Sequence, residues 1–370
     1  MSGPCLKFSA LYGSRKNNFN FLRLFFALLV ILSHSYPIIY GTEAGREAEP
    51  LYRWSHGQID FGALAVDAFF MISGFLLVGS WENSPGVLNF AGRRILRIYP
   101  GLIGCMIFCV FIAGPLGGAD LTTYFTNPDT YRLFQYVFMR NFWNSVPGAF
   151  PHNPTPEIIN SSLWTIKYEI FCYICLALLG LVRLLKPVPL LTITLAIFVF
   201  YNVLILRNLQ PLFSLDSLPK IANDFLVDPM PRFLTFFLMG SVFYLWRDSI
   251  PHSTLLFALS LVLVLASYHY ALDFTLPLFG GYALLYLGLT PKFHLPWFDK
   301  YDLSYGVYLF AWPVQQLALH YRWPGSDQPL LLFSLVLPPV FLLAALSWLC
   351  IEKPCLQFKK KRLKAATVSS

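Results

Sequence analysis

The sequence predicts an all-α fold: a polytopic bundle of about ten transmembrane helices with both termini in the cytoplasm. Three observations support it. Hydrophobic residues make up 56% of the 370 residues, charged residues only 12%, and the mean hydropathy is +0.57. A typical soluble domain carries about 25% charged residues, so this chain has too few polar groups to cover a water-exposed surface. Its apolar residues also fall in runs of about 20, the length that crosses a bilayer as a helix.

The spans follow from those runs. The first is read as a retained span rather than a signal peptide, because it contains His34 and Pro37 and no small-residue cleavage site follows it. Pro277 and Pro313 interrupt the eighth and ninth spans. The ten predicted spans are 19–40, 59–80, 95–115, 160–182, 188–206, 231–247, 252–269, 272–289, 303–322 and 327–350.

Orientation follows from the distribution of Lys and Arg. With the N-terminus in the cytoplasm, 17 of the 27 basic residues lie in cytoplasmic segments or span mouths and 7 in outer segments. The net charge of +8 is therefore expected mostly at the inner leaflet and requires no nucleic-acid partner. The segment 351–370 is expected to be a basic cytoplasmic tail lying against anionic lipid headgroups.

Two long outer loops are predicted at 116–158 and 207–230. The first is rich in Pro and aromatic residues, among them Phe142, Trp143 and Phe150. Such a composition suits a rigid rim on which sugars stack. It equally suits prolines that merely shape an ordered loop, and both interpretations remain open.

His34 is the one histidine predicted to lie well inside a span. Arg23 precedes it by 11 residues, about three helical turns, so the two share one face roughly 16 Å apart. Pro37 cannot donate to the Ser33 carbonyl and is expected to kink the helix beside His34. Ionisable groups in a span are costly and usually functional. A neutral imidazole, with a reference pKa of about 6.5, accepts a proton from a hydroxyl at neutral pH.

Two carboxylates also lie in predicted spans. Asp67 and Gly74 are seven residues apart and share a face, so a glycine seam is expected to bring Asp67 against another helix. Its role is either catalytic or that of a structural acceptor. Glu169 shares a face with Tyr173 but not with Lys167, so its partner is expected on another helix.

Arg93, Arg94 and Arg97 open the third span at its cytoplasmic end, followed by Tyr99-Pro100. They anchor the span or bind a phosphate-rich ligand, because guanidinium binds phosphate through two hydrogen bonds. A P-loop or GxGxxG motif, which would compete for that role, is not found.

Taken together, these motifs resemble the acyltransferase-3 family of integral membrane acyltransferases, which O-acylate polysaccharides and related glycans. The resembling stretches occur in the family's order. They are Arg23-x10-His34, Val66-Asp67-x-Phe69-Phe70-x-x-Ser73-Gly74-Phe75, Arg93-Arg94-x-x-Arg97-x-x-Pro100, Ser161-Ser162-Leu163-Trp164-x4-Glu169, Ser304-Tyr305-x-x-Tyr308-Leu309 and Trp348-x3-Glu352-x-Pro354.

The resemblance implies one membrane domain over 1–370, in the bacterial inner membrane, that takes acyl-CoA (usually acetyl-CoA) as co-substrate and a glycan or lipid-linked sugar as acceptor. It implies no permanently bound cofactor or metal and leaves the oligomeric state open. The implied catalytic residues are His34, Arg23, Glu169 and Asp67, and the implied CoA-binding residues are Arg93, Arg94 and Arg97. Residues in or near the same motifs, Ser73, Trp164 and Tyr173, are expected to contact substrate. Many relatives have a histidine within Leu309-Phe310-Ala311-Trp312-Pro313, and this chain has none there.

In the expected mechanism His34 is either the general base or a transient acyl carrier, and Glu169 or Asp67 orients the imidazole. A different class of protein is also considered: a transporter or flippase for a glycan or lipid intermediate, in which His34, Asp67 and Glu169 form a proton relay. The arginine cluster at the cytoplasmic mouth disfavours it, because a relay does not require those charges.

Overall fold

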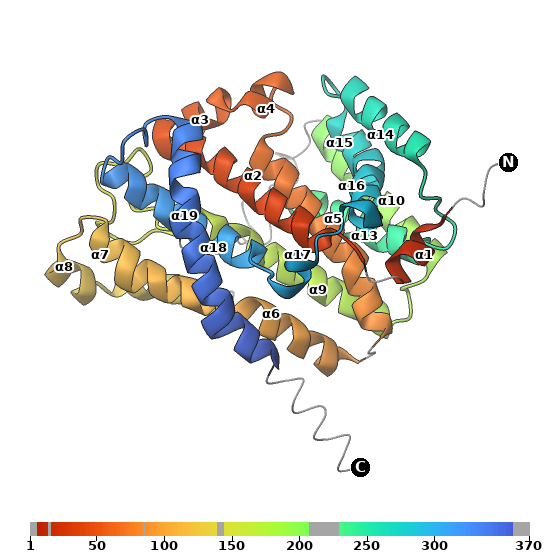
Figure 1. Cartoon of the computed structure of the whole chain (residues 1–370), viewed down its shortest axis with the longest axis horizontal. Helices are drawn as coiled ribbons and strands as arrows, with labels where there is room; N and C mark the ends of the chain where they lie inside the picture. The colour runs from red at the N-terminus through yellow and green to blue at the C-terminus, as the bar shows by residue number, and fades with distance from the viewer. Residues whose placement is uncertain (1–5, 14–15, 84–85, 139–143, 207–228, 358–370) are drawn as a thin grey trace, which may run out of the picture. The chain divides into compact units, whose positions relative to one another are not determined.

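A computed structural model of the chain describes residues 6–13, 16–83, 86–138, 144–206 and 229–357 (Figure 1). These residues form helices joined by turns and loops, and their only β pairings are two isolated bridges, Lys7 with Pro251 and Ser145 with Ile158. The expected all-α fold is confirmed. A helix satisfies its own backbone hydrogen bonds, as a segment in lipid must.

Six helical segments within the described ranges are long and apolar enough to span a membrane, and all six coincide with predicted spans. They are Phe19–Tyr40, Phe61–Glu82, Val87–Leu116, Ser161–Leu181, Leu272–Leu289 and Pro329–Gln357. Three shorter apolar helices, Pro187–Val203, Met230–Leu245 and Thr254–Ala266, coincide with three further predicted spans. The chain is a multi-pass membrane protein. The count of about ten spans and the cytoplasmic termini stay predictions.

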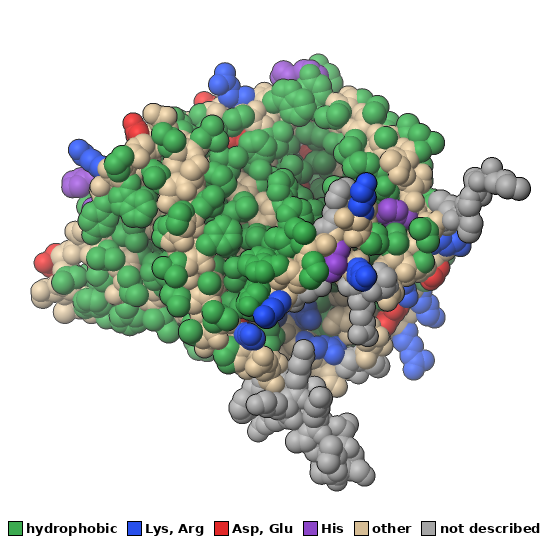
Figure 2. Space-filling view, viewed as in Figure 1, with side chains coloured by type: hydrophobic (Ala, Val, Ile, Leu, Met, Phe, Trp, Pro, Cys, Tyr) green, Lys and Arg blue, Asp and Glu red, His purple; other side chains and the backbone are tan. Residues whose placement is uncertain are grey.

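Exposed leucines support a lipid-facing position for the last of these segments. On α19 (Pro329–Ser347), Leu330, Leu342 and Leu346 are 64%, 61% and 49% exposed. Figure 2 shows a largely hydrophobic surface over this helix. Lipid can cover such side chains, whereas a soluble protein rarely exposes so many together.

The chain forms two compact units, each assembled from separate stretches. The first unit comprises residues 1–22, 63–90 and 168–296. Its helices are α1 (Phe8–Gly13), α5 (Phe61–Glu82), α9 (Ile166–Leu181), α10 (Pro187–Leu206), α13 (Met230–Leu245), α14 (Thr254–Ala266), α15 (Leu272–Thr275), η4 (Leu276–Gly280), α16 (Gly281–Leu289) and η5 (Pro291–Phe293).

The second unit comprises residues 23–62, 91–167 and 297–370. A helix that crosses a unit boundary is grouped with the unit that holds most of it. The helices of the second unit are α2 (Phe19–Tyr40), α3 (Thr42–Ala48), α4 (Pro50–Trp54), α6 (Val87–Phe108), η1 (Cys109–Ala113), α7 (Gly114–Leu116), α8 (Leu121–Thr126), η2 (Pro128–Phe138), η3 (Ser161–Thr165), α17 (Pro296–Lys300), α18 (Ser304–His320), α19 and η6 (Trp348–Glu352).

In the first unit, glycines let α5 and α13 approach closely. A Cβ atom on Gly74 would overlap the Phe237 backbone, and one on Gly240 would overlap the Met71 carbonyl. The Ser241 hydroxyl donates to the Gly74 carbonyl oxygen at 3.1 Å. Small residues permit this approach between membrane helices, so the predicted glycine seam is confirmed.

In the second unit, α18 runs beside α19 and continues through Pro313. Proline lacks an N–H group, so the Leu309 carbonyl loses its usual helical donor. The Asn160 amide donates to that carbonyl at 2.8 Å and the Cys105 thiol at 3.3 Å. These side chains replace the missing backbone bond, which explains how an unbroken helix tolerates Pro313. Pro277, by contrast, lies in the single π turn η4.

The loop that follows η2 is ordered where it is described. Phe150 is fully buried, and the Asn153 amide donates to the Gln316 side-chain oxygen at 2.7 Å. In turn, Gln316 donates to the carbonyl oxygens of Thr155 and Ile158. At Phe150 the ordered-loop interpretation holds. Phe142, Trp143 and most of the predicted loop 207–230 lie outside the described residues.

Candidate active site

His34 lies in α2 with its ring against α18. The imidazole meets the Trp312 ring edge-on, with centroids 4.9 Å apart and planes at 80°. The Trp312 indole is itself held by a hydrogen bond of 3.0 Å to the Ile158 carbonyl. The Nδ1 atom of His34 is buried and has no hydrogen-bond partner among the described residues. A buried polar atom without a partner is costly, so this nitrogen is a place where a hydroxyl-bearing ligand gains a hydrogen bond.

A buried glutamine fixes this part of α2 to α18. The Gln315 amide donates to the Ser35 hydroxyl at 2.8 Å and to the Ile31 carbonyl at 2.9 Å. Gln315 and Ser35 are both fully buried. Since Ser35 directly follows His34, these two bonds set the position of the imidazole relative to Trp312.

Near the start of α2, four charged residues of the second unit form a network. Arg97 on α6 contacts Asp302 at 2.7 Å and Glu352 at 3.6 Å. The guanidinium also lies 5.7 Å from the centre of the Tyr305 ring. Arg23 interacts electrostatically with Asp302 as well. Two guanidinium groups thus face two carboxyl groups, and this pairing of opposite groups suits partial burial.

The electrostatics of Asp302 show which effect dominates there. Burial disfavours the charged carboxylate, but Arg97, Arg23 and the hydrogen bonds from Ser304 outweigh it and hold the pKa of Asp302 below its ordinary value. The Ser304 hydroxyl donates to Asp302 Oδ1 at 2.7 Å. Asp302 is therefore ionised at neutral pH, as the ion pair with Arg97 requires.

Arg93 and Arg94 lie on the same helix as Arg97 and are half-buried. The spacing of the three arginines predicts one shared role. Arg97 also has a structural role, because it joins α6 to Asp302 and to Glu352 in η6. Phosphate binding by Arg93, Arg94 and Arg97 stays a prediction.

The segment that contains Trp164 is also anchored to α18. Tyr308 forms a 2.7 Å hydrogen bond with the Thr165 hydroxyl and one of the same length with the Ser162 carbonyl. Asn160 caps η3 by accepting from the Ser162 amide. Trp164, predicted to contact substrate, is 37% exposed.

In the first unit, Asp67 forms a buried ion pair with Arg232. Three hydrogen bonds of 2.6–3.2 Å join the guanidinium of Arg232 on α13 to the carboxylate of Asp67 on α5. The Asp67 side chain is 2% exposed and the Arg232 side chain 15%. The prediction that Asp67 meets another helix is confirmed, and its partner is a cation that satisfies both carboxylate oxygens.

Glu169 corrects one sequence-based expectation. It accepts a short hydrogen bond from the Tyr173 hydroxyl, four residues on in α9, whereas we expected a partner on another helix. Residues at positions i and i+4 are neighbours on a helix surface, so the shared face already indicated this contact. Tyr173 and Ser73 are buried in the first unit. Their predicted roles toward substrate stay predictions.

The predicted site residues are thus divided between the two units. His34, Arg23, Arg93, Arg94, Arg97 and Trp164 belong to the second unit, and Asp67, Glu169, Ser73 and Tyr173 belong to the first. The roles of Gln315, Gln316 and Asp302 were not predicted from the sequence. Two adjacent glutamines in an apolar run are costly to bury, as ionisable residues in a span are, and they indicate that this helix makes polar contacts.

The apolar helices, with charged and polar groups buried between them, define a multi-pass membrane protein with a polar interior. Comparison with known families then identifies the chain. Residues 16–349 match the family described as an acyltransferase domain, acyltransferase-3. The chain belongs to this family of membrane acyltransferases, and the resemblance drawn from its motifs is confirmed.

Two relatives match over nearly their whole length. The chain is 28% identical over 348 residues to an O-acetyl transferase of Shigella phage Sf6, covering 92% of this chain and 96% of the relative. It is 25% identical over 363 residues to nodulation protein 10 of Rhizobium leguminosarum bv. viciae, covering 93% and 94%. No solved structure matches the chain significantly.

Proposed function

We propose that this protein transfers an acetyl group from cytoplasmic acetyl-CoA to a hydroxyl of a glycan or lipid-linked sugar in the bacterial inner membrane. The observation that carries the proposal is His34, a histidine inside a membrane helix. Its buried Nδ1 has no partner in the part of the chain that the structure describes, and its ring is held against Trp312. Family membership supports the transferase class, and the name of the phage relative supports an O-linked acetyl product.

In this proposal His34 takes the proton of the acceptor hydroxyl as that oxygen attacks the thioester carbonyl. The C–S bond then breaks, and the CoA thiolate takes the proton back from the imidazolium. The products are an O-acetyl ester and CoA thiol. In the alternative covalent route the acetyl group first resides on the imidazole. A supporting role for Glu169 or Asp67 toward the imidazole stays a prediction.

The proposed site for the acetyl donor is the arginine-bearing part of α6, at the predicted cytoplasmic end of the third span. CoA phosphates would bind Arg93 and Arg94. Arg97 would form the rigid side of this site, because Asp302 and Glu352 hold its guanidinium. Arg23 belongs to the same network, and His34 lies about three turns further along α2. The pantetheine arm would follow this face of α2 to the imidazole.

The test is acetyl transfer from radiolabelled acetyl-CoA to glycan, measured for wild type, His34→Ala and the exposed control His152→Ala. We expect loss of transfer only in His34→Ala, with an unchanged melting temperature. Full activity of His34→Ala would refute the mechanism. Protection of the purified protein by acetyl-CoA in a thermal shift, reduced in Arg93→Gln/Arg94→Gln, tests the donor separately.

The transporter alternative has no comparable support. The family is one of acyltransferases, and both oxygens of Asp67, one of the three relay residues, are held by Arg232. A transporter also gives no reason for stabilisation by acetyl-CoA, so the thermal shift distinguishes the two functions.

A further inference from the structure

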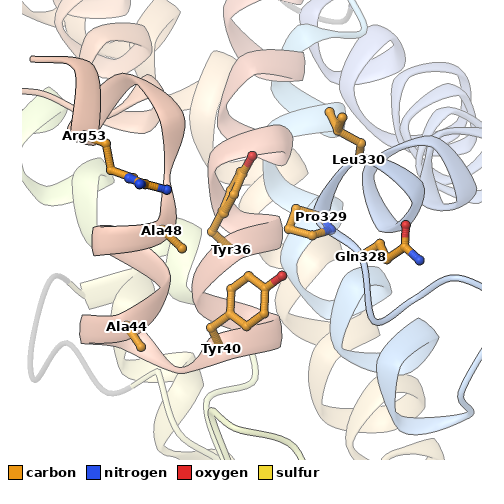
Figure 3. Close-up of a pocket in the computed structure, with 8 residues that line it drawn as sticks. All are labelled: Tyr36, Tyr40, Ala44, Ala48, Arg53, Gln328, Pro329 and Leu330. Carbon is orange, nitrogen blue, oxygen red and sulfur yellow. The ribbon is translucent and has the colours of Figure 1, made fainter.

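A groove opens in the second unit between the end of α2, the α3–α4 segment and the start of α19. Its volume is about 720 Å³, within the range of small-molecule sites. Eight residues line it: Tyr36, Tyr40, Ala44, Ala48, Arg53, Gln328, Pro329 and Leu330. Figure 3 shows the Tyr36 ring above the Tyr40 ring, with the Arg53 guanidinium directed toward Tyr36 from one side and Pro329 on the other.

Local sequence features build this groove. Tyr36 and Tyr40 are four residues apart and share one face of α2. Gly41, with φ of 83°, turns the chain into α3, and a Cβ on Gly45 would overlap Pro37, so α3 lies directly against α2. Buried Glu49 accepts from the backbone N–H groups of Tyr52 and Phe61, each at 2.7 Å, and holds α4 in place. The walls are therefore preformed.

The two arginines of the α3–α4 segment differ. Arg46 lies 3.6 Å from Asp60 and 4.7 Å from the centre of the Tyr52 ring, so its guanidinium is used within the fold. Arg53 is exposed and is the one charged residue among the eight that line the groove. A guanidinium in that position favours a carboxylate-bearing ligand. The tyrosine rings offer flat apolar faces together with hydroxyl groups, which suits a sugar ring.

The groove lies at the far end of α2 from the charged network. Arg23 and Tyr40 are 17 residues apart, about 26 Å along a helix, and His34 lies between them. Tyr36 follows His34 by two residues, a rotation of about 200°, so the two side chains point to opposite sides of α2. A single sugar residue cannot contact both. An acceptor that contacts both must therefore be longer than one sugar.

We propose that this groove binds an acidic segment of the acceptor polysaccharide, next to the sugar that is acetylated rather than at it. The inference rests on the proposed function, because it assumes that the acceptor is a glycan. It implies that the enzyme prefers an oligomeric acceptor to a monosaccharide, and that Tyr36, Tyr40 and Arg53 determine this preference.

The test uses the purified full chain and oligosaccharides cut from the surface polysaccharide of a strain lacking this gene, both as isolated and after chemical reduction of their carboxyl groups. Affinity is measured without acetyl-CoA for wild type, Tyr40→Ala and Arg53→Gln. The matched controls are Arg132→Gln and Tyr270→Ala, both at exposed positions of the chain.

We expect about a tenfold rise in Kd for Tyr40→Ala and Arg53→Gln, and wild-type affinity in both controls. Carboxyl reduction should weaken binding to wild type by a similar factor and change nothing further in Arg53→Gln. Unchanged affinity in the two groove variants would overturn the inference. The inference would also be overturned if the variants changed only the stability in detergent, because the tyrosines would then serve only as anchors at the membrane interface.

Because binding is read without acetyl-CoA, the two proposals fail separately. Groove-dependent binding by a protein that transfers no acetyl group would refute the proposed function and leave the groove site standing. If the groove variants transferred acetyl groups with wild-type kinetics and bound the oligosaccharide with wild-type affinity, the groove site would be refuted and the proposed function would stand.

Discussion

The side-chain nitrogen of Gln315 lies 2.8 Å from the hydroxyl oxygen of Ser35, the residue after His34. The same nitrogen donates to the Ile31 carbonyl, one turn earlier in α2. A single buried amide on α18 thus bonds to the Ile31 carbonyl before the proposed catalytic histidine and to the Ser35 hydroxyl after it, which makes Gln315 a positioning residue.

Gln315→Leu should lower kcat for acetyl transfer roughly tenfold while leaving the KM for acetyl-CoA unchanged, because a small misplacement of a catalytic group is costly. Loss of two neutral hydrogen bonds should also reduce the free energy of unfolding by about 1–3 kcal/mol. Steady-state kinetics and detergent denaturation measure both effects. Ser334→Ala, which removes an exposed helical hydrogen bond, is the control. Wild-type kcat in Gln315→Leu would contradict the positioning role.

Asp67→Ala and Arg232→Ala should each destabilise the protein by about 3–5 kcal/mol, because each leaves one charge buried without its partner. The double substitution Asp67→Ala/Arg232→Ala should cost much less than the sum of the single ones. Denaturation in detergent gives this double-mutant cycle. Additive losses would mean that the pair contributes nothing jointly. Transfer activity of the folded double variant then decides between the catalytic and structural roles of Asp67.

Gly74→Ala should destabilise the α5–α13 contact, because its Cβ would overlap the Phe237 backbone, which cannot move aside as a flexible side chain would. Gly13→Ala is the matched control, since a Cβ at Gly13 meets nothing within 4 Å. We expect a clear fall in melting temperature for the first variant and little change or a small rise for the second. Equal melting temperatures would show that the two helices are not closely packed.

The stability that Asp302 contributes to the folded protein should be lost in acid. Its pKa is held below the unfolded value of about 3.9, so its contribution is complete above that pH and is lost as the pH falls through the folded pKa. Asp302→Asn should therefore melt below wild type at pH 7, with the difference shrinking below about pH 4. Asp129→Asn, at an exposed pair with Arg132, should show almost no difference. A gap that does not change with pH would rule out this linkage.

Hydropathy alone located the long helices, because a 20-residue apolar run is a local property that lipid imposes directly. The Gly74 seam was also predictable, since a glycine on a membrane helix face indicates close approach whatever the partner. The partners themselves were not. Asp67 and Arg232 are 165 positions apart, and Arg97 and Asp302 are 205 apart, so the fold alone pairs them. The hydrogen bond between Tyr173 and Glu169 could have been predicted, because Tyr173 lies one turn away on the same face of the helix.

The separation of Asp67 from Arg232 also has a consequence for biogenesis. At synthesis rates of about 5–20 residues per second, Arg232 follows Asp67 out of the ribosome after roughly ten to thirty seconds. During that interval α5 carries an acidic group in an apolar helix, where a charge is costly to insert, and Arg232 has not yet been synthesised. The apolar residues around Asp67 must therefore insert α5 unaided, and α13 completes the pair only when the later half of the chain arrives.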